Sequence, residues 1–267
     1  MPETLVCFHA HPDDEAIQTG GTIARAADSG HRVVIVFATR GELGEVADGF
    51  LDPGETLAER RARECAAAAE VLGAQRVAFL GYRDSGMAGE PTNDDPSAFW
   101  QADLDEAAER LAAILREEDA AILTIYDDHG GYHHPDHIQV HRVGVRAAAM
   151  AGTPRVYEAT ADRDHFVKTL QESDVLSAEQ GLELPGDLPD PEDFVDHFTP
   201  AELITTRIDV SDLLDRKRAA LRAHASQIDE TSFFLALPDD VFAVAFGTEW
   251  FIRRGAPEGT RETWLFD

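Results

Sequence analysis

Two short segments, far apart in the chain, carry dense clusters of histidine and carboxylate side chains. Residues 11–15 read His-Pro-Asp-Asp-Glu, and residues 134–137 read His-Pro-Asp-His. Each cluster follows an apolar run, residues 4–8 in the first case and residues 120–126 in the second. Imidazole and carboxylate groups are typical zinc ligands, and the same groups also bind Fe²⁺. We therefore interpret the two clusters as two halves of one metal site.

The residue types predict how work is divided within that site. His11, Asp14 and His137 are the expected metal ligands. Three protein ligands leave a fourth position open for water, which is the arrangement of catalytic zinc. Zinc lowers the pKa of a bound water towards neutrality, so the adjacent Asp13 could take its proton as general base. Such a set of groups is suited to hydrolysing an amide.

Two further residues of the second cluster have expected roles beside the metal. His134 could stabilise a developing oxyanion or protonate the leaving group, and Asp136 could orient His134 or balance its charge. Either cluster alone has a simpler interpretation, because an aspartate before a helix is an ordinary N-cap. Two such clusters, each directly after a buried strand, favour the metal site.

The segments around the clusters have the pattern of an α/β fold. Short runs rich in valine and isoleucine alternate with segments of helical spacing. Continuously apolar strands are typical of a parallel sheet covered on both faces, so we expect a Rossmann-like, mostly parallel sheet. Ligands of such folds bind beyond the carboxyl ends of the strands, where both clusters fall. The expected strands are 4–8, 32–38, 76–80, 120–126, 155–158 and 205–210, and the expected helices are 15–29, 56–72, 103–116, 137–151 and 212–225.

Length and composition set wider limits. With 267 residues and 43% hydrophobic content, the chain is expected to fold as one α/β domain, 1–267. It has no apolar run of about 18 residues and no basic leader-like start, so neither a membrane span nor a signal peptide is expected. Cys7 and Cys65 show no Cys-x-x-Cys spacing and are expected to be reduced and buried, which favours the cytoplasm.

The charge balance constrains the partners. A net charge of −28 should repel nucleic acid and anionic membranes, which both require neutralisation by cations. Solubility is the simpler explanation of this charge, a cation or a basic partner is the alternative, and a homo-oligomer stays possible. Residues 87–96 are expected to form a loop, and residues 182–200 either a solvated connection or a lid.

The clusters and their surroundings resemble a known enzyme family. Residues 8–15, Phe-His-Ala-His-Pro-Asp-Asp-Glu, and residues 130–137, Gly-Gly-Tyr-His-His-Pro-Asp-His, are similar to motifs of the LmbE-like or PIG-L deacetylases. The similarity extends to residues 81–87 and 221–227, and is strongest to the branch that contains the mycothiol-pathway deacetylase and the mycothiol S-conjugate amidase. The LmbE-like or PIG-L deacetylases are zinc-dependent enzymes that remove acyl groups from N-acyl glucosamine units.

The resemblance implies the same ligands and base as above, with one Zn²⁺ per chain and Fe²⁺ as the alternative. It implies an electrostatic or acid role for His134, and it adds Tyr132, whose hydroxyl could reach the oxyanion. An aromatic ring packed against the loop is the simpler interpretation of Tyr132. It further implies that the later part of the chain, from about residue 160, shapes the substrate pocket.

Four more residues are expected near the substrate. Asp84 matches a family position beside the sugar pocket, and Arg61 matches a substrate-contacting arginine or forms a salt bridge on its helix surface. His224 either faces the site or is a core histidine. Gln18 stands where the S-conjugate amidase branch has a lysine, and an amide can bind a hydroxyl but brings no charge.

The expected function is therefore a metal-dependent hydrolase that deacylates an N-acetylglucosamine-type conjugate. One alternative is an amidase of a mycothiol-like S-conjugate or of a natural-product intermediate. A metal-dependent phosphoesterase is less favoured, because the chain offers a single clear ligand set. The last alternative is a sugar- or metal-binding protein without catalysis, which would not need an unligated base such as Asp13.

Overall fold

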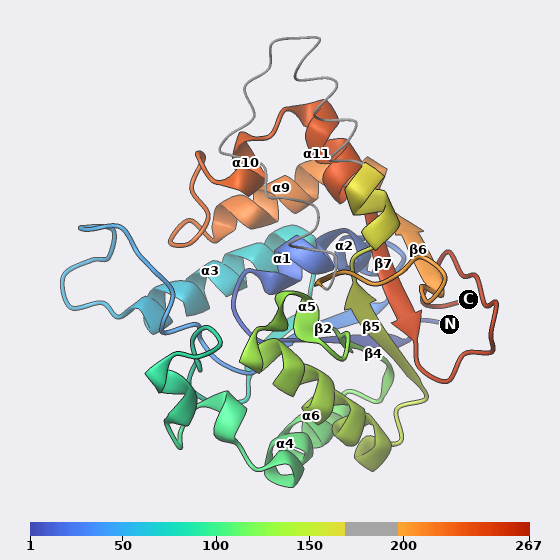
Figure 1. Ribbon diagram of the computed structural model, residues 1–267, viewed down its shortest axis with the longest axis horizontal. Coiled ribbons are helices and arrows are strands. Elements are labelled where there is room, and N and C mark those ends of the chain that lie inside the picture. Colours follow the sequence, from blue (N-terminus) through green and yellow to red (C-terminus); the bar gives the residue numbers. More distant parts are fainter. Residues whose placement is uncertain (169–196) are drawn as a thin grey trace.

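The computed structural model describes residues 1–168 and 197–267, built around a seven-stranded sheet in the order β3-β2-β1-β4-β5-β7-β6 (Figure 1). Strands β1 to β5 pair in parallel, whereas β7 is antiparallel to both β5 and β6. The predicted mostly parallel α/β sheet is confirmed. The strands are β1 (Thr4–His9), β2 (Arg32–Phe37), β3 (Arg76–Phe79), β4 (Ala120–Tyr126), β5 (Arg155–Thr160), β6 (Thr206–Asp209) and β7 (Thr248–Arg253).

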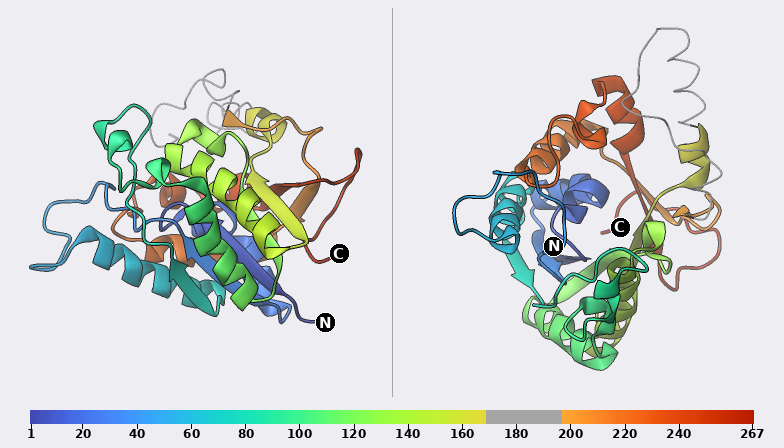
Figure 2. Two further views of the ribbon diagram at one scale, coloured as in Figure 1. Left: turned by 90° about the horizontal axis from the view of Figure 1, so that it is seen from below. Right: turned by 60° about the vertical axis from the view of Figure 1, so that its left-hand side comes forward.

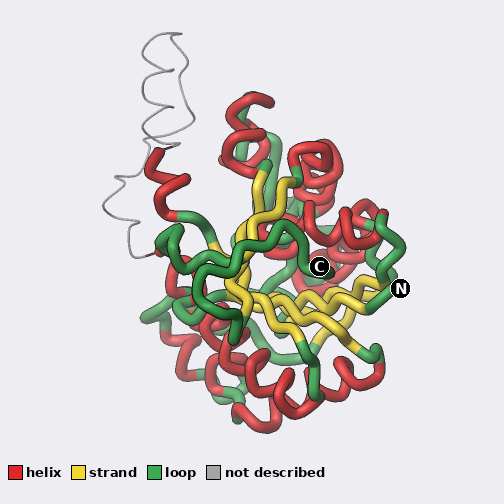
Figure 3. The backbone as a smooth tube through the Cα atoms, turned by 90° about the vertical axis from the view of Figure 1, so that its right-hand side faces the viewer, coloured by secondary structure: helices red, strands yellow, loops and turns green. Residues whose placement is uncertain are grey.

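Helices cover both faces of the sheet (Figures 2 and 3). Successive residues of β1 serve opposite layers: Leu5 and Cys7 pack in the core with α2, α3 and α9, and Val6 and Phe8 pack in the core with α4 and α6. This two-sided burial is the reason why the strands read as unbroken apolar runs. The α-helices are α1 (Asp14–Gln18), α2 (Gly20–Asp28), α3 (Leu57–Leu72), α4 (Leu104–Glu117), α5 (Gly130–His133), α6 (Pro135–Ala151), α9 (Leu214–Ala223), α10 (Phe233–Ala236) and α11 (Asp239–Phe246).

The order of the strands creates a crevice between β1 and β4. The chain runs outward from β1 to β2 and β3, and then returns to β4 on the other side of β1. Loops that leave two parallel strands on either side of such a reversal turn away from each other, and ligands bind in the gap between them. Both predicted clusters follow these two strands, so the fold brings them to one place.

The predicted helix over residues 15–29 is interrupted at Thr19, between α1 and α2. Two long-range contacts fix the start of α2. The Glu249 carboxylate accepts hydrogen bonds from the backbone N–H groups of Gly21 and Thr22, each at 2.8 Å. A side chain at position 21 would also collide with Val210, since an added Cβ would lie 2.4 Å from the Val210 Cβ. A carboxylate at a helix N-terminus is favourable, and it is supplied here by a distant strand.

Several other predictions can be compared with the described residues. The two cysteines are free and buried, as expected. The loop at 87–96 contains one 3₁₀ turn, Pro91–Asp94, and another 3₁₀ turn, Ser211–Leu213, precedes α9. Most of the stretch at 182–200 lies outside the described residues. No helix within 1–168 or 197–267 combines the length and apolar character needed to cross a bilayer.

Candidate active site

The two predicted clusters meet beyond the carboxyl ends of β1 and β4. His11 lies in the loop after β1, Asp14 is the first residue of α1, and His137 lies in the first turn of α6. The Asp14 Oδ2 atom is 3.5 Å from His11 Nδ1 and also 3.5 Å from His137 Nε2. All three side chains are buried. The structure thus brings together the three residues that the sequence suggested as ligands.

The donor set fits a divalent ion. Among the described residues, nothing hydrogen-bonds either ring nitrogen of the buried His137. An unpartnered buried polar group costs about 1–3 kcal/mol, so this imidazole needs a partner. In a tetrahedral zinc site with bonds of about 2.1 Å, neighbouring ligand atoms lie about 3.4 Å apart. The two 3.5 Å spacings from Asp14 match that geometry, although His11, Asp14 and His137 do not form one of the groups of described residues whose ligand atoms all lie within 4.8 Å of one another. Fe²⁺ accepts the same ligand types.

Two overlapping groups of buried donors have ligand atoms within 4.8 Å of one another. The first is His11, His134 and His137, and the second is His11, Asp84 and Asp136. His134 therefore lies beside the suggested ligands and is itself close enough to serve as one. The second group surrounds the opposite edge of the His11 ring.

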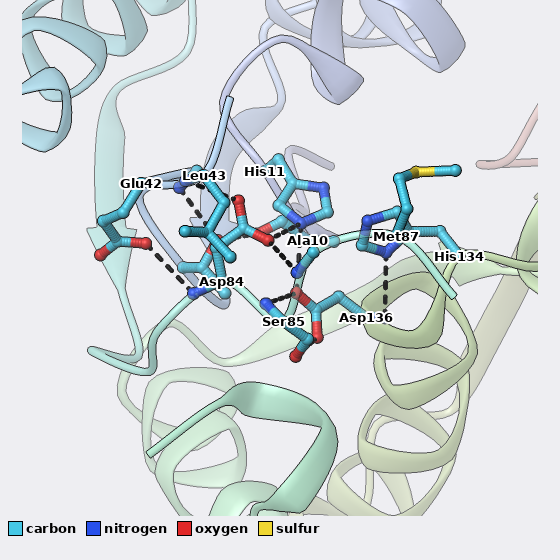
Figure 4. A network of polar contacts seen from close by, with 12 residues as sticks. Ala10, His11, Glu42, Leu43, Asp84, Ser85, Met87, His134 and Asp136 are labelled. Atoms are coloured by element: carbon cyan, nitrogen blue, oxygen red, sulfur yellow. Dashed lines mark hydrogen bonds and ion pairs between the residues drawn. The ribbon is translucent and has the colours of Figure 1, made fainter. Parts of the chain in front are cut away.

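That opposite edge is held by carboxylates (Figure 4). His11 Nε2 lies 3.2 Å from Asp136 Oδ2 and 3.5 Å from Asp84 Oδ1. Asp136 also accepts hydrogen bonds from the backbone N–H of Ser85, at 2.9 Å, and from its hydroxyl. With its proton on Nε2, His11 presents Nδ1 as a lone-pair donor towards Asp14. Carboxylates commonly orient metal-binding imidazoles in this way.

Asp136 does not orient His134 as expected, because its carboxylate faces His11 and Ser85. Instead, the Asp136 backbone N–H donates to His134 Nδ1 at 3.1 Å. Since Nδ1 accepts, a neutral His134 carries its proton on Nε2. Burial, together with the neighbouring His11 and His137, lowers the pKa of His134 to about 3. The neutral ring is then a hydrogen-bond donor, which favours the role of oxyanion stabiliser over that of acid.

Asp13, the expected base, has a strained backbone, with φ 107° and ψ −33°. Its N–H donates to Glu15 Oε2 at 3.0 Å, and its Oδ2 accepts from Arg61 Nη2 at 3.1 Å. Burial raises the pKa of Asp13, although Arg61 opposes the shift. A raised pKa suits a general base near neutral pH. Such backbone conformations persist only where the surroundings hold them.

Arg61 is one of those surrounding groups. The Arg61 side chain is buried, so the alternative expectation of a salt bridge on the exposed surface of α3 is wrong. The guanidinium donates to the carbonyl oxygens of Gly41, at 2.8 Å, and Pro12, as well as to Asp13. Gly41, at φ +62°, permits this approach, because an added Cβ would lie 2.1 Å from Arg61 Nη1. Arg61 positions the Asp13 carboxylate, and direct contact with substrate stays a prediction.

Glu15 and His224 form the layer behind Asp13. His224, at the end of α9, is fully buried, and its Nε2 is 2.6 Å from Glu15 Oε1. The sequence left open whether His224 faces the site or is a core histidine, and it did not indicate Glu15 as the partner of His224. Glu15 belongs to the first cluster, so its position was visible, whereas a contact with α9 was not.

The other predicted site residues lie around this centre. Tyr132 is 47% exposed, with its ring centroid 5.1 Å from that of His137, so its hydroxyl is not locked in the core. Gln18 ends α1 and lines a cavity next to the site. Asp84 accepts from the backbone of Gly86, at 2.9 Å, and thereby orders the loop after β3.

The sequence of this chain matches a known family. Residues 6–148 match the family model described as PIG-L, GlcNAc-PI de-N-acetylase. The chain therefore belongs to the PIG-L family. It is similar to a protein of Acidothermus cellulolyticus named 1D-myo-inositol 2-acetamido-2-deoxy-alpha-D-glucopyranoside deacetylase, with 43% identity over 94% of this chain and 89% of that one. A protein of the same name from Thermobifida fusca is 42% identical over 96% of this chain and 94% of its own.

A solved structure shows the same architecture. The N,N'-diacetylchitobiose deacetylase from Pyrococcus horikoshii, complexed with its inhibitor, superposes with a TM-score of 0.56. It is 25% identical in sequence, and the match covers 90% of this chain and 73% of that one. The predicted LmbE-like fold and the predicted family are confirmed.

Proposed function

We propose that this chain is a metal-dependent N-deacetylase that hydrolyses the amide of an N-acetylglucosamine-type conjugate. One observation carries the proposal: Asp13 is a carboxylate outside the suggested ligand set, yet it is held by Arg61 and Glu15 beside it. The names of the relatives support the substrate class. A cytoplasmic location and a single domain, with the part after about residue 160 forming the substrate pocket, belong to the same proposal.

We assign His11, Asp14 and His137 as the residues that would hold the metal ion. A bound Zn²⁺ would supply Lewis acidity that polarises an amide carbonyl. Asp13 would accept the proton of the attacking water, since it lies next to the ligands and has a raised pKa.

The remaining site residues would stabilise charge on the carbonyl oxygen. The Nε2–H of neutral His134 and the partly exposed Tyr132 hydroxyl are the donors available for it. A single donor of this kind is typically worth about 2.7–4 kcal/mol of barrier. The amine would leave with a proton delivered from the water by way of Asp13.

The arrangement argues against the two other function classes. A binding protein has no use for a general base held beside the suggested ligands, such as Asp13. A phosphoesterase needs cationic groups that are free to meet phosphate. Arg61, the arginine beside Asp13, already donates to three oxygens of the protein. An S-conjugate amidase stays the alternative within the family, and Gln18 is the residue that bears on it.

A panel of N-acetylated sugars tests the proposal, with the released amine quantified by fluorescamine. The panel includes the inositol conjugate named for the relatives. We expect turnover by the Zn²⁺-loaded protein, and a loss of about 10²–10⁴-fold in Asp13→Asn with unchanged metal content. Asp52→Asn, at an exposed aspartate, is the control. Near-normal turnover by Asp13→Asn would refute the base, and no amine from any amide would refute the function.

A further inference from the structure

Tyr126 is a buried polar residue that has no part in the proposed hydrolysis. It is the last residue of β4, and only 2% of its surface is exposed. The parallel pairing of β1 with β4 ends at Cys7 and Thr124, so the two strands separate before Tyr126 is reached. Beyond that point a side chain replaces the strand pairing. The Tyr126 hydroxyl accepts a hydrogen bond from the backbone N–H of Ala10, at 3.2 Å.

The same hydroxyl belongs to a network of buried hydrogen bonds. It lies 3.1 Å from His9 Nδ1, and His9 Nε2 lies 3.1 Å from the Thr19 hydroxyl. Thr19 in turn donates to the carbonyl oxygen of Glu15, at 3.3 Å. Each of these groups has a partner when the Tyr126 hydroxyl donates to His9 Nδ1 and His9 Nε2–H donates to Thr19. The network therefore runs from β4 through β1 to α1 and the break that follows it.

The ring and the backbone of Tyr126 contact the helix on the other side of the crevice. The ring centroid lies 4.5 Å from that of His137, with an interplanar angle of 37°. The Tyr126 carbonyl oxygen lies 3.0 Å from Nδ1 of His141, one turn further along α6. Tyr126 thus holds the start of α6 as well as the loop after β1.

These contacts reach the segments that carry all three suggested ligands. Ala10 directly precedes His11, and α1, at the far end of the network, begins with Asp14. The Tyr126 ring itself lies against His137. An aromatic side chain has few internal degrees of freedom, and this one is packed on every side. Its position therefore sets the separation between the two halves of the site.

We propose that Tyr126 is a positioning residue, which holds His137 through its ring and the loop of His11 through its hydroxyl, so that both imidazoles reach one metal ion. The inference rests on the proposed function, because it takes the same ligands. It goes beyond that function by assigning a role to Tyr126 and to its partner His9.

A pair of matched variants tests the proposal by metal affinity. Tyr126→Phe keeps the ring but leaves the Ala10 N–H without its partner. The affinity for Zn²⁺, measured by competition with a chromophoric chelator, should fall about 10–100-fold, the usual cost of losing a group that orients a ligand. Tyr157→Phe is the control, because Tyr157 is equally buried and its hydroxyl donates to the carbonyl oxygen of Leu265, at 3.2 Å.

The control separates positioning from general destabilisation. Each variant loses one buried hydroxyl, so the two should lose similar amounts of stability, while only Tyr126→Phe should lose metal affinity. An affinity of Tyr126→Phe within about twofold of wild type overturns the proposal. Equal losses of affinity in Tyr126→Phe and Tyr157→Phe overturn it as well.

Substitution with Co²⁺ gives a readout that a merely structural role would not move. The visible absorption of bound Co²⁺ depends on the number and arrangement of its ligands. We expect the bands to change in Tyr126→Phe and to remain those of wild type in Tyr157→Phe. A wild-type spectrum in Tyr126→Phe contradicts positioning.

Variants of His9 test whether the hydroxyl acts through the network. His9→Leu should weaken Zn²⁺ binding about as much as Tyr126→Phe, and the double variant should be little weaker than either, since both changes break the same network. His9→Gln retains a donor and an acceptor and should recover most of the affinity. Fully additive losses overturn the network. If Tyr126→Phe does not fold, equal affinities of His9→Leu and His9→Gln overturn it instead.

Metal binding and hydrolysis are measured separately, so the inference and the proposed function can fail separately. If the wild-type protein hydrolyses an N-acetyl amide and Tyr126→Phe binds Zn²⁺ as tightly as wild type, the inference fails and the function stands. If no amide is hydrolysed but Tyr126→Phe binds Zn²⁺ more weakly than Tyr157→Phe, the function fails and the inference stands. A wild-type protein that binds no Zn²⁺ would overturn both.

Discussion

The imidazole of His224 and the carboxylate of Glu15 form a buried pair, 2.6 Å apart and separated by 209 positions in the sequence. Burial alone favours the neutral imidazole, yet the Glu15 carboxylate raises the pKa of His224. The other oxygen of Glu15 accepts the N–H of Asp13, at 3.0 Å. The pair is therefore part of what holds the strained backbone of the expected base.

Replacing His224 should impair turnover without removing the metal. In His224→Phe, Glu15 loses its partner and Asp13 loses alignment, so we expect kcat to fall about 10–100-fold, because small misplacements are costly to catalysis. His224→Gln keeps a donor and should retain more activity. The measurements are kcat, KM and metal content. Arg222→Ala, on the same helix with an exposed ion pair, is the control. A parallel loss of metal and activity in His224→Gln would count against positioning.

Two adjacent arginines provide a second test. The Arg61 guanidinium donates hydrogen bonds to the Asp13 carboxylate and to the carbonyl oxygens of Pro12 and Gly41. A lysine ammonium cannot reproduce this planar geometry. Arg61→Lys should lower kcat about 10–100-fold with KM nearly unchanged, since the Asp13 carboxylate is no longer fixed. Arg60→Lys should leave both constants within about twofold, because Arg60 pairs with Glu55 away from the site. A rise in KM with normal kcat would show that Arg61 binds substrate instead.

Two neighbouring histidines distinguish ligand from donor. His137→Gln should abolish stoichiometric zinc binding, because it removes a suggested ligand whose nitrogens have no other partner in the described structure. His134→Gln should keep the zinc and lower kcat about 10²–10³-fold through the loss of an oxyanion donor. Metal content by mass spectrometry, alongside kcat, gives the readout. Zinc loss in His134→Gln would shift the ligand set to His11, His134 and His137.

Glu118 joins the amino ends of two strands and should contribute to stability. The Glu118 carboxylate accepts hydrogen bonds from Arg32 Nη2, at 3.1 Å, and from Arg76 Nη1, at 2.7 Å. The hydrogen bond with Arg32 has the largest effect in lowering the pKa of Glu118, and the one with Arg76 adds to it. Both arginines are partly exposed, so we expect Glu118→Gln to lower the free energy of unfolding by only about 1–2 kcal/mol at pH 7. Glu117→Gln, at the exposed neighbour, should cost less than about 0.5 kcal/mol.

The same variant should show a defined pH dependence. A carboxyl whose pKa is lowered by folding stabilises above its unfolded pKa of about 4.3 and loses that contribution as pH falls through the folded value. The difference between wild type and Glu118→Gln in urea unfolding should therefore shrink as pH falls from 7 towards about 3. A difference that grows with acid would contradict the ion-pair explanation.

The central strands and the site loops were predictable because their signals are local. The run at 5–8 is apolar throughout since both faces of β1 are buried, and the two clusters follow β1 and β4. The neighbourhood of His11, Asp14 and His137 follows from strand order, which the alternation of strands and helices already favours.

The features that escaped prediction depend on distant partners. The break at Thr19 follows from Val210 and Glu249, which lie about 190 and 230 positions further on. Strand β7 and the helices α10 and α11 were not predicted, because their short apolar segments read equally well as helix or strand. Asp136 was expected to orient His134 or balance its charge, because the two are neighbours in sequence. In the structure, the Asp136 carboxylate contacts Ser85 and His11.

The position of β1 between β2 and β4 has a consequence for synthesis. A nascent chain exposes His11, Asp13 and Asp14 early, but the strand that completes their surroundings and the imidazole of His137 are translated more than a hundred residues later. His224 follows later still. Fragments that end before position 137 lack His137, one of the proposed metal ligands, so the candidate site is complete only when the second half of the polypeptide has docked.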